Sequence, residues 1–443
     1  MKFSYGAARF CAFAALLSLA EFVLADTLLI TNVNLWDGTS DEFEPGMNVL
    51  IEDEVFEKIS ATDIVAPGAQ VVDGEGMYLM PGFIDLHTHF MLHDGPPGWR
   101  KLDSAAHGAL AAYDMKQQLE QGFTTTRGAG SDSRSLGALV KMGKIVGPRH
   151  LSSGPWIGPT GGHGDFGFIH DAPDDMDYME KAQQSFVVDG RAEVLEATRS
   201  VLRGGATQIK LMLGGGLSSE FDPLWVNEFT LDEIKAAVEI AEDYTTYAMA
   251  HVYTDAGVNR AIDGGVKVIE HGFLSGEKTF KRMAKEGVAW SFQAFAAVGP
   301  VCEPEKIGFW NADQKKKALE ICVGAKKSAA AARKAGVLIG LGGDLFGPVG
   351  MPSINENMVV PVTKFGFTEI ETLKMATSNA AQIVEMAGEM NPYKAHKLGV
   401  IQTGAWGDAV LLDGNPMEDI TRVRPEHILM VVKGGVIYKD AMN

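Results

Sequence analysis

Histidines at the ends of short apolar runs are the residues of this 443-residue chain best suited to chemistry. His87 and His89 are two residues apart, and side chains at that spacing on a strand share a face, so both imidazoles can reach one ion. His251 and His271 end two later apolar runs, and Asp344 ends another. Imidazole and carboxylate are common ligands of divalent metals. The sequence therefore predicts a metal site assembled from several strand ends.

Lys210 is a charged residue inside the apolar run Thr207–Leu213. Burial disfavours the ammonium form and lowers the pKa of the amine. A neutral amine can capture CO2, and the resulting carbamate is an anionic ligand with two oxygens that can bridge two cations. Taken alone, Lys210 would be read as an ion-paired lysine or one that extends its amine to solvent. The four histidines and Asp344 at matching strand ends favour a metal ligand.

These residues require a scaffold that brings strand ends together. Eight apolar runs alternate with helix-length amphipathic stretches such as Leu231–Asp243, which is the pattern of repeated βα units. The predicted strands centre on Ile84, Thr125, Leu151, Ile209, Ala250, Val268, Trp290 and Ile339. The predicted fold class is α/β, a (β/α)8 TIM barrel, in which sites form at the C-terminal ends of the strands.

Both ends of the chain read differently from its middle, as short strands and turns. We expect them to join in a small composite β-sandwich domain. The predicted organisation is a signal peptide over residues 1–25, β-sandwich segments over 26–80 and 391–443, and a metal-dependent hydrolase barrel over 81–390.

The N-terminus has the pattern of a secretory signal. Lys2 and Arg9 precede the apolar run Phe10–Ala20, and small residues ending at Ala25 offer a cleavage site. The alternative is an uncleaved anchor, but the run stops at Glu21 and is shorter than the roughly 20 residues that span a bilayer. The expected location is therefore exported, periplasmic or secreted.

Charge and cysteine content limit the partners. The chain has 39 Lys and Arg against 57 Asp and Glu, a formal charge of −18, so a nucleic-acid partner is not expected. No later segment reads as membrane-spanning, so no membrane association is expected after signal cleavage. Cys302 and Cys322 would either form a disulfide or remain buried thiols, and the sequence leaves both open.

In this order of motifs, the chain resembles the amidohydrolase superfamily. The resemblance covers essentially all of the mature chain, through the return into the β domain at Leu398–Pro416. It implies two divalent metal ions, with zinc the default for imidazole and carboxylate ligands. One metal would be held by His87, His89 and Asp344, and the second by His251 and His271, with carbamylated Lys210 as the bridge.

Two stretches narrow the resemblance within the superfamily. Gly158–Asp165 and the glycine-rich segment Gly214–Ser219 are similar to the branch of Xaa-Pro dipeptidases (prolidases) and ochratoxin-hydrolysing amidohydrolases. This implies hydrolysis of an amide or peptide bond next to a C-terminal carboxylate, by a metal-bridging hydroxide. The substrates would be dipeptides, N-acyl amino acids or ochratoxin-like amides. The resemblance also implies a homo-oligomer, as large as an octamer.

Three residues are predicted to act on the substrate. Asp344 would serve as general base toward the water and then as general acid toward the leaving amine. Tyr253, two residues beyond His251, would donate its hydroxyl to the oxyanion, the alternative being a core tyrosine. His163 would hydrogen-bond the substrate carbonyl or carboxylate, the alternative being a histidine that caps its loop.

Other functions remain open from the sequence. A deaminase or a cyclic-amide hydrolase of the imidazolonepropionase kind could use the same scaffold, and Asp255, four residues after His251, supports a deaminase only weakly. A non-catalytic binding relative would be expected to lack metal ligands, and none is missing here. His93, Trp156 and Trp225 fall in loops predicted on the same face as the site.

Overall fold

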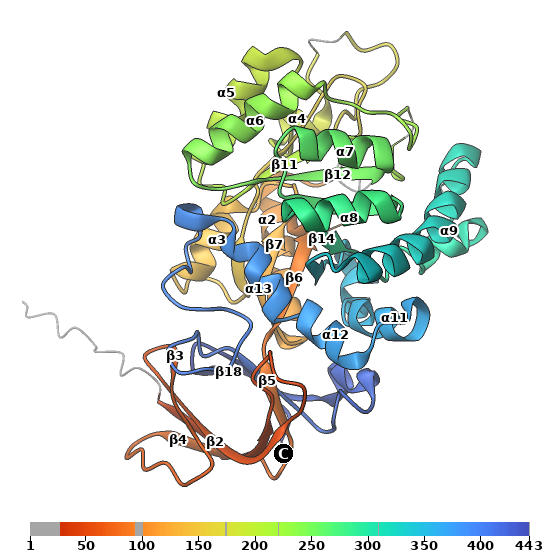
Figure 1. Ribbon diagram of the computed structural model, residues 1–443. Helices are drawn as coiled ribbons and strands as arrows, with labels where there is room; N and C mark the ends of the chain where they lie inside the picture. Colours follow the sequence, from red (N-terminus) through yellow and green to blue (C-terminus); the bar gives the residue numbers. More distant parts are fainter. Residues whose placement is uncertain (1–26, 94–100, 173–174, 220, 309, 443) are drawn as a thin grey trace, which may run out of the picture.

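The computed structural model describes residues 27–93, 101–172, 175–219, 221–308 and 310–442, so the predicted signal segment 1–25 lies outside the described residues. A barrel-like array of parallel strands and helices lies on one side, and a β-sheet formed by both chain ends lies on the other (Figure 1). Among the helices of the described residues, none has the length and apolar character that a membrane span requires.

The barrel strands occur where the apolar runs predicted them, because all eight predicted centres lie inside observed strands. All pairs are parallel, in a three-stranded sheet β6-β7-β8 and a seven-stranded sheet β10-β9-β11-β12-β13-β14-β15. A parallel bridge between Thr88 and Leu345 connects the last strand region to the first. The strands are β6 (Phe83–Thr88), β7 (Phe123–Gly128), β8 (Arg149–Leu151), β9 (Trp156–Gly158), β10 (Ser185–Val187), β11 (Ile209–Met212), β12 (Ala248–Thr254), β13 (Val268–Leu274), β14 (Ala289–Phe292) and β15 (Ile339–Leu341).

The third barrel strand is divided into two short pieces. β8 pairs with β7, while β9 pairs with β11 through Ile157 and Leu211. The Gln208 side chain, just before β11, donates to the carbonyls of Gly128 at the end of β7 and Leu151 at the end of β8, at 3.0 and 3.1 Å. A side chain thus supplies hydrogen bonds where the backbone ladder is interrupted.

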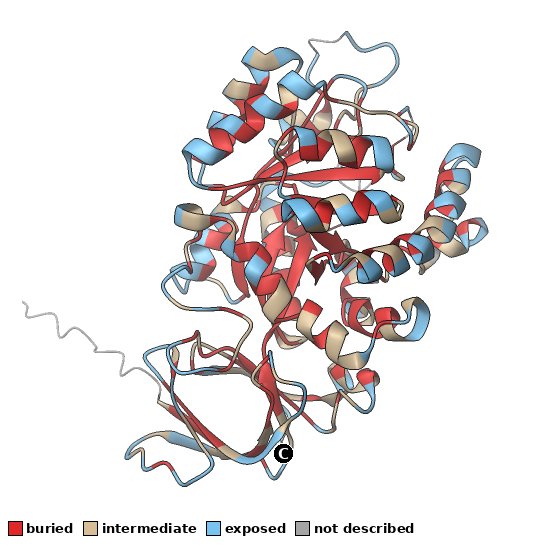
Figure 2. Cartoon of the chain, viewed as in Figure 1, coloured by how far each residue is buried: buried red, intermediate tan, exposed pale blue. Residues whose placement is uncertain are grey.

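Helices cover the outside of the strands, with their buried faces turned inward (Figure 2). In α6, the buried residues recur at helical spacing, and Thr230 and Glu233 form a capping box at its start. The helices are α2 (Ser104–Glu120), α3 (Arg134–Lys141), α4 (Tyr178–Lys181), α5 (Gly190–Arg203), α6 (Leu231–Asp243), α7 (Asp255–Asp263), α8 (Glu277–Glu286), α9 (Ala312–Ala335), α10 (Gly347–Gly350), α11 (Glu356–Phe365), α12 (Glu369–Met375) and α13 (Ser378–Glu385).

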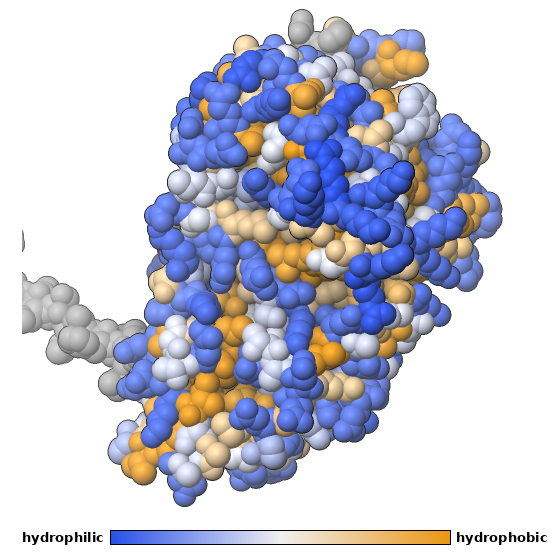
Figure 3. Space-filling model, viewed as in Figure 1, coloured by the Kyte–Doolittle hydropathy of each residue, from blue (hydrophilic) through white to orange (hydrophobic). Residues whose placement is uncertain are grey.

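The two chain ends share one mixed eight-stranded sheet, as expected of a composite β domain. Its order is β18-β17-β16-β5-β1-β2-β3, with β4 paired to β1, and the ends meet where β16 runs antiparallel to β5. Hydrophilic residues cover most of the face seen in Figure 3, with smaller apolar groups between them. The strands are β1 (Leu28–Leu35), β2 (Glu44–Glu52), β3 (Val55–Ser60), β4 (Gln70–Asp73), β5 (Tyr78–Pro81), β16 (Ala409–Leu412), β17 (Ile428–Lys433) and β18 (Val436–Asp440).

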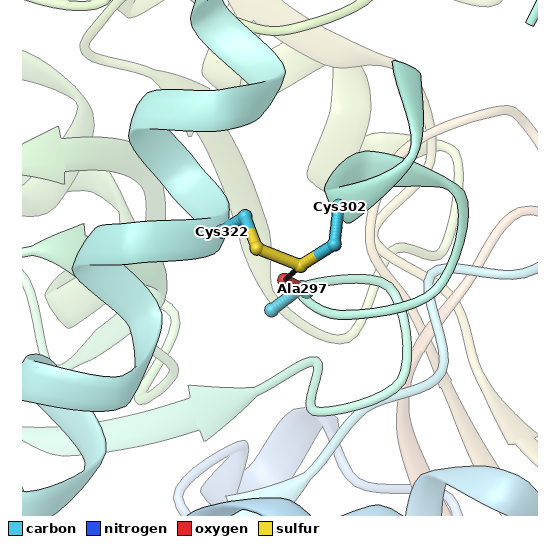
Figure 4. The surroundings of a disulfide bond; sticks show 3 residues. All are labelled: Ala297, Cys302 and Cys322. Atoms are coloured by element: carbon cyan, nitrogen blue, oxygen red, sulfur yellow. Dashed lines mark hydrogen bonds between the residues drawn. A yellow bond between two sulfur atoms is a disulfide. The ribbon is translucent and has the colours of Figure 1, made fainter. Parts of the chain in front are cut away.

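A disulfide joins Cys302 to Cys322, which decides between the two alternatives left open by the sequence. The bond links the short helix η2 (Pro300–Cys302) to α9, with the two Cα atoms 5.3 Å apart. Figure 4 shows the Cys302 sulfur facing the carbonyl oxygen of Ala297, which lies 3.8 Å away. The bridge therefore fixes the segment between β14 and α9 against α9 itself.

We expect the Cys302→Ser/Cys322→Ser double variant to lose about 2–4 kcal/mol of unfolding free energy, because an open chain regains the entropy that the cross-link removes. Denaturant unfolding of the oxidised wild type and the variant measures this difference. Wild type unfolded in the presence of dithiothreitol should match the variant. Equal stabilities of the oxidised wild type and the variant would contradict the expectation.

Candidate metal centre and substrate cavity

The C-terminal ends of the barrel strands open into a cavity of about 630 Å³. Every metal-ligand and catalytic residue expected from the sequence lines this cavity: His87, His89, His163, Lys210, His251, Tyr253, His271 and Asp344. Their strands are consecutive or nearly so around the barrel, which is why residues far apart in sequence meet here.

His87, His89 and Asp344 form the tightest group in the cavity. One ligand atom from each lies within 4.8 Å of the others, and the Nε2 atoms of the two histidines are 3.1 Å apart. Asp344 Oδ1 lies 3.5 Å from His87 Nε2 and 3.3 Å from His89 Nε2. Three donor atoms thus converge on one point.

A buried carboxylate sets the orientation of His87. Its Nδ1 lies 2.6 Å from Glu270 Oε2, and the other Glu270 oxygen accepts from the Arg127 guanidinium. Glu270 is an acceptor in this pair, so Nδ1 carries the proton and Nε2 presents a lone pair to the cavity. Burial also holds the pKa of His87 well below its usual value, although the nearby Asp344 carboxylate raises it. The low pKa favours the neutral ring.

These residues fit a metal ion. Two imidazole nitrogens that face each other as acceptors would repel, and a cation between them and the carboxylate removes that repulsion. His251 Nε2 is also buried without a hydrogen-bond partner among the described residues. A buried polar atom without a partner is costly unless a ligand satisfies it. The donor set of nitrogens and carboxylate oxygen suits a divalent metal.

The remaining expected metal ligands are Lys210, His251 and His271. The rings of His251 and His271 are 4.5 Å apart between centroids, and His271 Nδ1 lies 3.9 Å from Asp344 Oδ2. Lys210 is 1% exposed, and burial lowers its pKa to about 8, against the opposing effects of Glu270 and Asp344. Part of the Lys210 population is therefore a neutral amine near neutral pH.

Two of the expected ligands have left-handed backbones, which non-glycine residues rarely adopt. The φ angle is +69° at His271 and +54° at Asp344. Two hydrogen bonds hold them: His271 N donates to Gln293 Oε1 at 3.0 Å, and Asp344 N donates to the carbonyl of His87 at 2.8 Å. Such conformations persist where the surroundings fix them, and they concentrate at functional sites.

Tyr253 lies directly against the metal ligands. Its ring stacks on His271 with centroids 5.2 Å apart and packs edge-on against His251. Burial raises the pKa of the phenol, as does the nearby Asp344 carboxylate, so the hydroxyl stays protonated. It can therefore act as a hydrogen-bond donor within the cavity.

His163 reaches the cavity from the loop after β9 and stacks on His251, with centroids 4.1 Å apart. Its Nδ1 lies 2.6 Å from Ser219 Oγ and 3.2 Å from Asp222 Oδ2, which leaves Nε2 for the cavity. The ring packs so closely on Gly216 that a Cβ there would lie 1.9 Å from an imidazole atom. Gly216 is thus required for this placement.

A buried lysine fixes the loop that holds His163. Lys317 on α9 donates to the carbonyls of Gly216, Ser219 and Asp222 at 2.9, 3.1 and 2.7 Å. The position of His163 therefore depends on a helix that begins about 150 residues further along the chain.

Apolar side chains form the rest of the cavity wall. Val301 and Ile321 adjoin the two disulfide cysteines and both line the cavity. His93 and Trp156 line the cavity, although Trp156 lies in strand β9 and not in a loop as predicted. Trp225 is 73% exposed and is not among the lining residues. Further apolar lining residues are Leu92, Phe166, Met179, Met212, Phe273, Trp310 and Phe346.

Asp255 does not support a deaminase. Its carboxylate accepts from Gly276 N and from the Thr279 hydroxyl, at the first turn of α7. It acts there as a structural link between α7 and the start of α8.

The residues behind the ligands were not predicted from the sequence. Glu270 is fully buried beside His271, and Arg127 is fully buried on β7. Glu270 could have been found by the argument applied to Lys210, because it also is a charged residue within an apolar strand. Glu228, whose Oε1 accepts from His163 N at 2.9 Å, had no such signal.

Comparison with known proteins finds relatives over most of the chain. A family model described as "Amidohydrolase family" matches residues 78–438. Ochratoxinase from Aspergillus niger is 30% identical over 386 residues, which are 82% of this chain and 75% of that protein.

Two solved structures match almost the whole chain. A prolidase crystallised with N-methylphosphonate-L-proline superposes with a TM-score of 0.85 at 31% identity, covering 94% of this chain and 100% of its own. A Xaa-Pro dipeptidase with methionine bound in its active site has a TM-score of 0.82 at 28% identity, covering 93% of this chain and 100% of its own.

Glu228 should make stability fall as pH rises. Burial raises its pKa from 4.5 to about 7, so the folded chain binds more protons than the unfolded chain between these values. The contribution of Glu228 to the unfolding free energy is therefore fully present below pH 4.5 and is lost as the pH rises to 7. At 1.36 kcal/mol per pKa unit, this contribution is up to about 3 kcal/mol.

Glu228→Gln should remove that part of the pH dependence, because the amide oxygen can still accept from His163 N. Denaturant unfolding at pH 5 and pH 8 measures both proteins. The expectation fails if wild type and variant lose the same free energy between these two pH values.

Proposed function

Because the chain belongs to the amidohydrolase family, we propose that it is a binuclear metal-dependent hydrolase of amide or peptide bonds next to a C-terminal carboxylate. The substrates are dipeptides, N-acyl amino acids or ochratoxin-like amides. The observation that carries the proposal is the convergence of His87, His89 and Asp344 within 4.8 Å, in a cavity with an otherwise largely apolar wall.

His87, His89 and Asp344 would hold one divalent metal, and His251 and His271 a second, with Lys210 between them. When bound, two such cations, zinc by ligand preference, supply a water acidified toward neutral pH and a Lewis acid for the substrate carbonyl. Neutral Lys210 Nζ attacks CO2, an N–C bond forms and a proton leaves, and the product is a carbamate. Its two oxygens give the buried lysine a negative charge that suits two cations.

Three residues of the chain act on the substrate in this proposal. Asp344 accepts the proton of the attacking water at a carboxylate oxygen and returns it to the nitrogen of the leaving amine. The Tyr253 hydroxyl donates to the oxygen that becomes negative as the carbonyl is attacked. His163 offers its Nε2 to the substrate carbonyl or carboxylate, held in place by Asp222 and Ser219.

The apolar wall supports a substrate with a bulky side chain. Aromatic and aliphatic residues contributed by several strand-end loops surround the metal ligands. A cavity of about 630 Å³ is of the size that takes small-molecule ligands. This favours an apolar acyl or amino-acid group over a charged side chain.

We also propose that the chain is exported after cleavage at Ala25 and that it self-associates. Large apolar side chains exposed on the loops after β9 and β11 favour contact with a second copy, because exposed apolar groups of this size mark interaction sites. They are Phe168, Ile169, Met176, Phe221 and Trp225. N-terminal sequencing of exported protein and sedimentation velocity test the two proposals: a retained signal or a monomer would overturn them.

The function is tested by amino-acid release from Xaa-Pro dipeptides, other dipeptides and N-acyl amino acids, using the mature zinc-supplemented chain. We expect release that falls at least about a hundredfold in His271→Ala, because even partners behind a metal ligand affect activity by ten- to a hundredfold. His396→Ala is the matched control and should keep wild-type rates, since His396 bonds the Gly404 carbonyl outside the cavity.

Release of ammonia without a new amino acid would select a deaminase, and release from lactams alone would select a cyclic-amide hydrolase. Carboxylation of Lys210 has its own readout, a carbamate signal in ¹³C NMR after incubation with ¹³C-bicarbonate. Lys210→Ala should lack that signal. A wild-type protein that is active with zinc and shows no such signal would overturn the bridging role.

A further inference from the structure

The cavity has a second histidine held by a buried aspartate, outside the metal group. His93, at the end of η1 (Phe90–Leu92), places Nδ1 2.6 Å from Asp114 Oδ2 on α2. Asp114 is 1% exposed, and His93 is 9% exposed and lines the cavity. Because Nδ1 is engaged by Asp114, Nε2 is the nitrogen that His93 offers to the cavity.

The backbone of His93 lies against the segment that carries Asp344, and both residues line the cavity. The His93 carbonyl oxygen packs against Gly347, where a Cβ would come within 1.8 Å of it. Gly347 is three residues beyond Asp344, and three peptide units span at most about 11 Å. Phe346, between them, also contacts the ring of His89, with centroids 6.2 Å apart. One short segment thus connects the metal ligands to His93.

The proposed substrates carry a carboxylate, and the cavity offers few groups to bind one. Among the described lining residues there is no arginine, and the one lysine is Lys210, in the metal group. Outside that group, His93 and His163 are the lining imidazoles that can donate a ring N–H to an anion. His163 stacks on His251, so it lies at the end of the cavity where the metal ligands converge. His93 is the remaining position for an anion.

We propose that His93, positioned by Asp114, binds the carboxylate of the substrate through Nε2. With a carboxylate at each ring nitrogen, Nδ1 donates to Asp114 and Nε2 donates to the substrate. His163 then hydrogen-bonds the substrate carbonyl, at the end of the cavity where the metal ligands lie. This inference rests on the proposed function and names the residue that selects substrates with a free carboxylate.

Binding of two probes of nearly equal shape tests the proposal without requiring turnover. Calorimetry with the full chelator-treated chain compares N-acetyl-L-phenylalanine, an anion, with N-acetyl-L-phenylalaninamide, which is neutral. We expect wild type to bind the acid about tenfold or more tighter, as charge-assisted hydrogen bonds are about twice as strong as neutral ones. Treatment with chelator prevents hydrolysis and removes any binding of the carboxylate to metal.

Three variants assign the preference to this pair. His93→Gln should bring the acid-to-amide ratio near one. Asp114→Asn keeps an acceptor for Nδ1 but removes the charge, and should reduce the ratio with little change in amide binding. Asp103→Asn, which removes an exposed carboxylate at the start of the same helix α2, is the matched control and should keep the wild-type ratio.

A wild-type ratio near one, or a ratio unchanged in His93→Gln, would overturn the proposal. If His93→Gln fails to fold, Asp114→Asn decides by the same ratio. In the zinc-loaded chain, His93→Gln should raise KM for substrates with a free carboxylate and leave KM for their amides near wild type. The wild-type chain could prefer the acid, lose that preference in both His93→Gln and Asp114→Asn, and yet hydrolyse no amide. That result would refute the proposed function and support the role of His93 in carboxylate binding.

Discussion

The ion pair between Arg127 and Glu270, fully buried, is the interaction on which the geometry of the site depends. Glu270 shares its oxygens between the guanidinium and the imidazole of His87, and Gln293, just after β14, donates to Glu270. A buried carboxylate without these partners would be strongly destabilising, so each member holds the others in place. Strands β6, β7, β13 and the segment after β14 are thereby connected beneath the cavity.

The same arrangement explains how a strained site persists. Gln293 donates to Glu270 through its amide nitrogen and accepts from His271 N through its oxygen. The left-handed backbone of His271 is thus tied to the buried ion pair by one side chain. Asp344 is tied to the carbonyl of His87, whose ring Glu270 orients. Both unusual backbones are supported by the network below the metal ligands.

Sequence reasoning found what depends on local pattern. Alternating apolar runs placed the eight strand centres. Lys210 was singled out by its place within one such run, together with the histidines and Asp344 at other strand ends. Contacts between distant segments were not predicted. Examples are the hydrogen bonds from Lys317 to the loop that holds His163 and the contact between Asp114 and His93. Nothing local marks those residues, because an amphipathic helix carries lysine and aspartate for many reasons. The disulfide was undecidable for the same reason, since pairing depends on a distance that the fold sets.

Because the barrel is divided into two sheets, metal ions bound at the site would also connect one sheet to the other. His87 and His89 belong to the end of the three-stranded sheet, whereas Lys210, His251 and His271 belong to the seven-stranded one. In the described residues these sheets share no ladder and meet through side chains and the Thr88–Leu345 bridge. Ions held by residues of both sheets would cross-link the two sheets at the cavity end of the barrel. Hydrogen exchange at the boundary between the two sheets, more than within either sheet, would then report whether the ions are bound.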